Sequence, residues 1–262
     1  MSLPPPSRRR GIALAIAVFS ILLLIMRMGM QQSNRQAAEA AIPTLTLTQE
    51  VALGQTAAPA IVAAHGGISH DATQAATVKR VGEHLASTLD AAKNPWKFEF
   101  QLLAEPNVLD AYALPGGQIF ITTALLNRLQ TEGQLAAILA QQIAHVNNRH
   151  VAKQLKALGL TTVLLSAAGG DPITQLVPEV VKFAFTADQE LVADREAAGI
   201  MSKAGYNPNA LTGALGILST AYYAKAEVAY FTTHPNAQNR LENITSAIAA
   251  LYPTGAPATL SK

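Results

Sequence analysis

The sequence predicts an α+β domain that is mostly helical, contains a small antiparallel sheet and follows one N-terminal membrane-spanning segment. Three observations support this prediction. Apolar residues recur with helical spacing over most of the chain after residue 48. Two short β-rich runs are bounded by Asn-Pro and Pro-Gly-Gly turns. A basic N-terminal stretch runs into fifteen uncharged residues, 12–26.

The composition excludes several classes of protein. Half of the 262 residues are hydrophobic and 14% are charged, which excludes a disordered chain. Cysteine is absent, so disulfide scaffolds, thiol nucleophiles and cysteine-ligated metals are excluded as well. The net charge of +2 comes from the N-terminal residues, because residues 41–262 carry 14 basic and 16 acidic side chains. We therefore expect no nucleic-acid partner.

The N-terminal segment has the composition of a membrane anchor. We predict a basic cytoplasmic tail over 1–10, a signal anchor over 11–30 and a linker over 31–47. The arginines before the span place the main domain in the periplasm, in a single-pass protein of the bacterial inner membrane. A second interpretation stays open, in which a signal peptide is cleaved near Ala38-Glu39-Ala40 and the protein is soluble in the periplasm.

The first half of the following domain contains two predicted helices and two predicted strands. One helix covers about 48–65, and a second runs from an N-cap at Asp71 to about Ala92. Alternating residues over Trp96–Leu103 and a β-rich run over Gln118–Thr122 predict two strands that pair antiparallel.

The second half is predicted to be helical throughout. Thr131 and Gln134 have capping-box spacing, and the helix that they start continues to about Lys156. A long helix is expected from about 178 to 204, another begins at Asn207-Pro208, and the last begins after His234-Pro235. The predicted domain thus covers 48–252, and 253–262 form a C-terminal tail.

Three places carry side chains suited to metal chemistry. The first is Gln141–His145 within the predicted helix, the second is Glu190 with Asp194, and the third is His234. Side chains at i and i+4 of one helix face a common point, and a third ligand from another helix completes a helical zinc-peptidase site.

The motifs in which these residues lie resemble those of a known family. Five segments occur in the family's order and spacing: Asp110-Ala-Tyr-Ala-Leu-Pro-Gly-Gly, EGQLAAILAQQIAHVNNRH from Glu132, ELVADREAAG from Glu190, GYNP and HPNAQNR. They are similar to those of zinc metallopeptidase family M48, the gluzincins that include the CAAX prenyl proteases and HtpX, and within it to members with an exported soluble domain. The resemblance implies a gluzincin-type fold and, in the family, a zinc cofactor.

The chain departs from the family where the chemistry is expected. The zinc motif HExxH is replaced by QQIAH, so Gln141 stands at the position of a lost His ligand and Gln142 at that of the general-base Glu. His145 and Glu190 occupy inherited ligand positions, which leaves two ligands and predicts weak or absent zinc. A glutamine amide has no basic lone pair near neutral pH and cannot accept a proton from a metal-bound water.

The resemblance also implies roles for residues around the site. Asp194 corresponds to an acid that orients a ligating His, although an ion pair with Arg195 or Arg240 explains it equally well. His234 corresponds to a His near the catalytic cleft and is a candidate third ligand, although a cap at the start of the last helix is the stronger alternative. The turn at Gly116 and Gly117 and the strand starting at Gln118 and Ile119 correspond to the border of the substrate cleft, where a peptide adds to an exposed edge; a plain hairpin is the alternative.

Two functions follow as hypotheses. The favoured one is a membrane-anchored, catalytically impaired pseudoprotease that binds polypeptide or membrane-protein clients in envelope protein quality control. The alternative is an active zinc metalloendopeptidase whose site is rebuilt from His145, Glu190 and His234. A structural subunit of a membrane complex has no positive signal in the chain, and the sequence makes no prediction about oligomeric partners.

Overall fold

A computed structural model describes residue 27 and residues 42–165, 171–182, 184–224, 237–257 and 260. The chain divides into two units, Met1–Pro43 and Thr44–Lys262, and the second contains every element discussed below. The predicted anchor lies outside the described residues except for Arg27, and His234 lies outside them too. Among the described residues no helix is both long enough and apolar enough to cross a bilayer.

The first two helices of this unit begin at side-chain caps. Helix α2, Leu47–Ala64, starts with a capping box between Thr46 and Gln49 that the sequence analysis did not identify. Helix α3, Ala72–Ser87, starts at Asp71 as predicted, and its carboxylate accepts from the backbone N–H of Gln74 at 2.9 Å. It ends before Ala92, since the hydroxyl of Thr88 donates to a carbonyl of the last turn.

The three strands form a mixed sheet in the order β1-β3-β2. Strand β1 is Glu99–Leu103, β2 is Ala111–Ala113 and β3 is Gln118–Thr122. The predicted antiparallel pairing of β1 with β3 is wrong, because these two strands are parallel. The three-residue strand β2 had no detectable alternation, yet it forms the hairpin with β3 and so takes the antiparallel edge.

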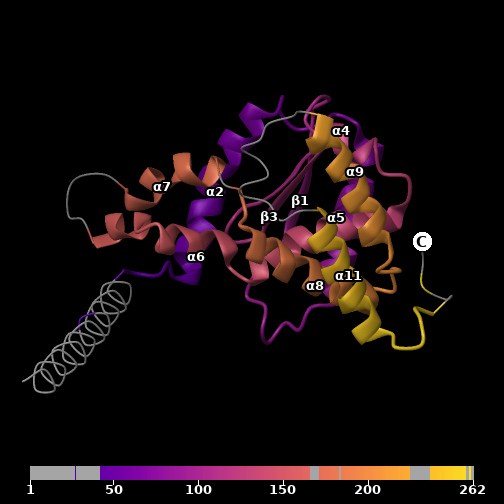
Figure 1. The fold of residues 1–262 in the computed structure, drawn as a ribbon. Coiled ribbons are helices and arrows are strands. Elements are labelled where there is room, and N and C mark those ends of the chain that lie inside the picture. The colour runs from indigo at the N-terminus through magenta and orange to yellow at the C-terminus, as the bar shows by residue number, and fades with distance from the viewer. Residues whose placement is uncertain are drawn as a thin grey trace, which may run out of the picture. The chain divides into compact units, whose positions relative to one another are not determined.

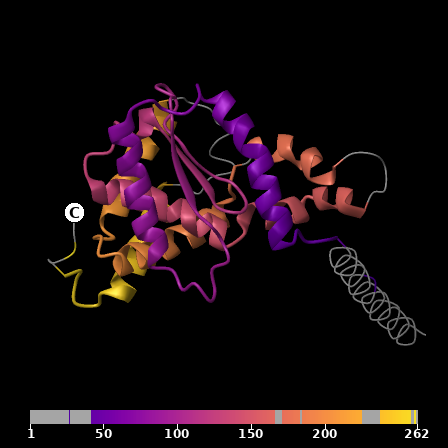
Figure 2. The same ribbon diagram turned by 180° about the vertical axis from the view of Figure 1, so that it is seen from behind.

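The sheet separates two hydrophobic cores, and Figures 1 and 2 show helices on both of its faces. Alternation along β3 directs Ile119 and Ile121 toward the larger core, which contains residues of α3 and of α5, Glu132–Asn147. Phe120 points to the opposite face, where a second core holds residues of α2. The central strand is therefore buried on both sides.

Helix α5 follows the short helix α4, Thr123–Leu126, and ends earlier than predicted. Its N-cap Thr131 accepts from Gln134 as expected, but the Gln134 side chain accepts from the N–H of Gln130 instead of closing a capping box. The predicted continuation to Lys156 is wrong, because Arg149 has a left-handed φ of 54° and separates α5 from α6, His150–Ala157. The Arg149 guanidinium bonds the buried Glu50 carboxylate, which stabilises the break.

The remaining elements complete the helical layers. They are η1 (Leu160–Leu165), α7 (Pro172–Val181), α8 (Ala187–Lys203), α9 (Ala210–Ala224) and α11 (Ala237–Leu251). The single helix predicted over 178–204 is divided into the end of α7 and the whole of α8. Helix α8 has its own N-terminus, a capping box of Thr186 and Gln189.

Candidate functional site

Helix α5 places three of the predicted site residues in the interior. It packs against α8, α3, α9 and the sheet, so its apolar residues are buried around most of its circumference. Gln141, Gln142 and His145 lie among them, with 5%, 7% and 2% of their surface exposed. Buried polar groups of this kind need hydrogen-bond partners from neighbouring elements.

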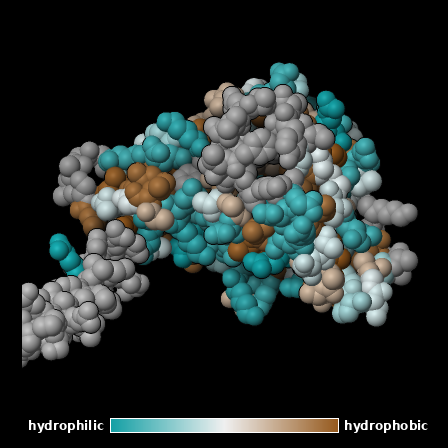
Figure 3. All heavy atoms as spheres, in the orientation of Figure 1, coloured by the Kyte–Doolittle hydropathy of each residue, from teal (hydrophilic) through white to brown (hydrophobic). Residues whose placement is uncertain are grey.

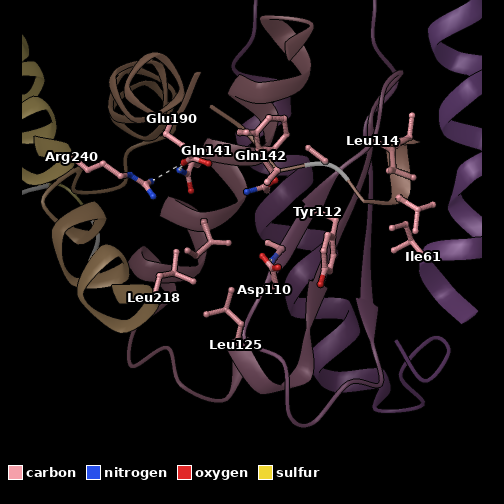
Figure 4. A pocket seen from close by; sticks show the side chains of 17 residues that line it. Ile61, Asp110, Tyr112, Leu114, Leu125, Gln141, Gln142, Glu190, Leu218 and Arg240 are labelled. Atoms are coloured by element: carbon pink, nitrogen blue, oxygen red, sulfur yellow. Dashed lines mark hydrogen bonds and ion pairs between the residues drawn. The ribbon is translucent and has the colours of Figure 1, made fainter. Parts of the chain in front are cut away.

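The Gln141 amide finds its partners on α8. Its Nε2 donates to Glu190 Oε2 at 2.9 Å and to Asp194 Oδ1 at 3.2 Å, as Figure 4 shows for Glu190. The two carboxylates are four residues apart and share one helix face. Both neighbours are acceptors, so the NH₂ end of the amide must face them.

Arg240 of α11 pairs with the same two carboxylates. Its Nε and Nη2 donate to the two oxygens of Asp194 at 2.8 and 2.7 Å, and Nη2 lies 3.3 Å from Glu190 Oε2. The structure thus confirms the ion pair of Asp194 with Arg240 that the sequence analysis left as an alternative. A bidentate guanidinium–carboxylate pair is the strongest common arrangement of this type.

His145 lies beside this network and bonds a second histidine. Its Nε2 is 3.9 Å from Glu190 Oε2, and its Nδ1 is 2.9 Å from Nδ1 of His150. Burial, helped by the charge of Lys153, lowers the pKa of His150 to about 4, so its ring is neutral at neutral pH, and which of the two Nδ1 atoms donates depends on the tautomers. The His145 ring stacks on Phe185 at 3.6 Å between centroids. Neither His150 nor Phe185 was a predicted site residue: His150 ends the matched segment that starts at Glu132, and Phe185 lies outside the motifs.

The electrostatics of the site raise the pKa of the Glu190 carboxyl. Burial raises the pKa of this carboxyl to about 7, the nearby Arg240 lowers it in part, and the acids Asp194 and Asp110 raise it further. The carboxyl therefore carries a proton for part of the time near neutral pH.

A cavity of about 150 Å³ opens beside these residues, as Figure 4 shows. Gln142, Glu190 and Arg240 line it on one side, and Asp110 and Tyr112 line it on the other. The side-chain oxygen of Gln142 is buried and accepts no hydrogen bond from any described residue.

The residues that the structure describes around this site do not fit a three-ligand zinc site. Within the described residues no three His, Asp or Glu side chains cluster in a way that could hold a metal. His145 and Glu190 provide two donor atoms, but the third position presents the hydrogens of the Gln141 amide, and these point to Glu190. The guanidinium of Arg240 adds a positive charge 3.3 Å from the same oxygen.

The predicted substrate edge does not lie where the sequence analysis placed it. Gln118 and Ile119 belong to β3, which is paired on both sides, so they form part of a hairpin and not a free edge. Gly116 has a φ of +87°, and a Cβ there would lie 2.5 Å from the Cα of Val51, so the turn needs glycine for packing. The outer strand at the cavity is β2, whose Tyr112 is in the lining.

Comparisons with known proteins agree with this arrangement of motifs. The profile of peptidase family M48 matches residues 72–248. The putative beta-barrel assembly-enhancing protease of Vibrio cholerae is 26% identical over 215 residues, which is 76% of this chain and 44% of that protein. The beta-barrel assembly-enhancing protease of Escherichia coli K12 is 26% identical over 181 residues, 63% of this chain and 37% of its own.

A mitochondrial relative is similar over a shorter range. The mitochondrial metalloendopeptidase OMA1 of Schizosaccharomyces pombe is 31% identical over 156 residues, which is 56% of this chain and 46% of that protein. The chain spans less than half the length of each of these three relatives.

Proposed function

We propose that this chain, which belongs to peptidase family M48, binds polypeptide segments without cleaving them. M48 peptidases use zinc, and the proposal is that this member has lost the zinc site and kept the surrounding cleft. The observation that carries it is the pair of buried amides at 141 and 142.

The amide of Gln142 removes the proton acceptor of the reaction. A glutamine oxygen cannot take a proton from an attacking water at neutral pH, and loss of a general base lowers the rate by about 10²–10⁴. Gln141 stands where the family has a His ligand, and its amide donates a hydrogen bond to Glu190, an inherited ligand position on α8. Both changes affect one helix turn and leave the neighbouring cavity open.

The proposed client is an extended polypeptide. Strand β2 is an outer strand beside the cavity, and a peptide that pairs with such an edge gains main-chain hydrogen bonds whatever its sequence. Two of the relatives are named for enhancing the assembly of beta-barrels, which suggests a membrane-protein client in envelope protein quality control. We further propose that residues 11–30 anchor the domain in the bacterial inner membrane, facing the periplasm.

One observation favours a second candidate, an active enzyme. His145 Nε2 and Glu190 Oε2 remain 3.9 Å apart, within the span of two metal–ligand bonds of about 2 Å each. A rebuilt zinc site would need His234 as its third residue, which lies outside the described residues.

Zinc content and casein cleavage of the purified full chain distinguish the two functions. The proposal expects substoichiometric zinc and no cleavage that a chelator abolishes, and stoichiometric zinc with chelator-sensitive cleavage would refute it. The double variant Gln141→His/Gln142→Glu is expected to gain zinc and activity together. Gln175→His, an exposed change on α7, is the matched control and should gain neither.

A further inference from the structure

One end of the domain exposes a cluster of aliphatic side chains. Leu158 and Leu165 are 61% and 70% exposed, the highest values among the large hydrophobic side chains described. Leu160, Val163 and Leu164 lie between them and are partly exposed. We call these five residues the apolar tip, and Figure 3 shows hydrophobic side chains gathered over this end of the molecule.

The inner residues of the apolar tip are anchored, whereas its outer leucines are not. Leu160, Val163 and Leu164 pack against the second core, which fixes the position of η1. Leu158 and Leu165 belong to neither core of the described residues. Exposed apolar surface of this kind marks an interaction site, because removing it from water is favourable by about 25 cal/mol per Å².

The course of the chain indicates what covers the apolar tip. Lys156, two residues before Leu158, donates from Nζ to the hydroxyl of Thr44 at 3.0 Å. Thr44 is the first residue of the folded unit, so the chain enters the domain beside α6. Only residues 31–43 separate it from the proposed anchor, and they reach at most about 45 Å when fully extended. The point where the chain enters the folded unit and the apolar tip therefore lie at the same end of that unit.

The charges around the apolar tip suit an anionic lipid surface. Lys153 is exposed and Lys156 is partly exposed on the helix that leads to the tip. The nearest acid in sequence after η1, Asp171, caps α7, where its oxygens accept from the Ile173 N–H and the Thr174 hydroxyl. Lysines next to a lipid-facing surface gain energy from anionic headgroups.

We propose that the apolar tip inserts into the surface of the membrane that anchors the protein, as a second contact with the lipid. The inference rests on the proposed anchor at 11–30. Tethering raises the local concentration of lipid at the tip, so a few aliphatic side chains are sufficient for a stable contact. The contact would hold the α6–η1 end of the domain against the bilayer.

Single-cysteine labelling of the full chain tests this inference, since the natural sequence has no cysteine. Leu158→Cys and Leu165→Cys are each labelled with an environment-sensitive fluorophore. The chain is then reconstituted into vesicles of phosphatidylethanolamine and phosphatidylglycerol that contain a brominated lipid. The matched control is Leu251→Cys, an exposed leucine at the end of α11, on the other side of the sheet in Figures 1 and 2. Flotation of the vesicles reports the anchor separately.

The expected result is flotation of all three proteins, with blue-shifted and quenched emission at 158 and 165 and aqueous emission at 251. Adding Leu158→Glu to the labelled Leu165→Cys protein should reduce the quenching. Flotation with equal, aqueous emission at all three positions would overturn the inference and leave the anchor intact. Loss of flotation would refute the anchor, and the inference with it. Quenching that appears only after a second protein is added would assign the apolar tip to a protein partner instead.

Discussion

Replacing Arg240 by Met is expected to destabilise the folded protein more than any other single charge removal at the site. Methionine fills much of the same volume but donates no hydrogen bond. Asp194, only 1% exposed, would lose both bonds to the guanidinium, and Glu190 would lose its nearest cation. The Gln141 amide would be the remaining donor to both carboxylates among the contacts described here.

The size of the effect follows from the geometry of the pair. Removing one partner of a buried ion pair costs about 3–5 kcal/mol, because the other charge stays in a medium of low polarity. The free energy of unfolding of a typical domain is only about 5–15 kcal/mol. At about 2–4 °C per kcal/mol for a domain of this size, the melting temperature should fall by roughly 6–20 °C.

Urea unfolding at pH 7, followed by circular dichroism, measures the change. Arg195→Met is the matched control, because Arg195 is exposed next to Asp194 in sequence, and this change should stay within about 0.5 kcal/mol. Adding Asp194→Asn to the Arg240→Met protein should recover part of the loss, since it removes the unpaired charge. A loss below about 1 kcal/mol in Arg240→Met, or no recovery in the double variant, would refute the reasoning.

Three further predictions concern pH, the helix break and packing. The Glu190 carboxyl has a pKa of about 7 in the folded state and 4.5 in the unfolded state, so between these values the folded state binds more protons and stability falls as pH rises. Urea unfolding from pH 4.5 to 8 should show a loss of about 3 kcal/mol relative to Glu190→Gln. A free-energy difference between the two proteins that stays constant with pH would contradict this prediction. Arg149→Met leaves the buried Glu50 carboxylate without its guanidinium and should lower the unfolding free energy by about 3–5 kcal/mol, whereas unchanged thermal melting would contradict that role. Gly54→Ala places a Cβ 1.9 Å from a carbonyl oxygen of the β2–β3 turn, and calorimetry should show an unfolding free energy lower by at least about 1–3 kcal/mol. In the control Gly199→Ala the new Cβ meets nothing within 4 Å, and the unfolding free energy should not fall.

Local signals predicted the elements they act on. The Asp71 cap and the Thr131 cap are encoded within a few residues, and the structure confirms both. The strand predicted over Trp96–Leu103 is confirmed over Glu99–Leu103, and its predicted start at Trp96 is wrong. The break at Arg149 had no such signal. A left-handed conformation at a non-glycine residue depends here on a carboxylate from α2, about a hundred positions away in the chain. The parallel pairing of β1 and β3 had no local signal either, because β2, the strand between them in the chain, is too short for a periodic pattern.

The sequence by itself determined which chemical groups are available at the family's motif positions. Amides stand at 141 and 142, and the proton affinity of a side chain is a property of the residue, so the missing base and the missing ligand needed no coordinates. Only the tertiary structure decided what replaces them. Gln141 bonds carboxylates 49 and 53 positions away, and Arg240 closes the network from a third helix. These partners depend on the packing of distant helices, because polar groups that are buried away from water must form hydrogen bonds with the groups that lie next to them in the folded protein.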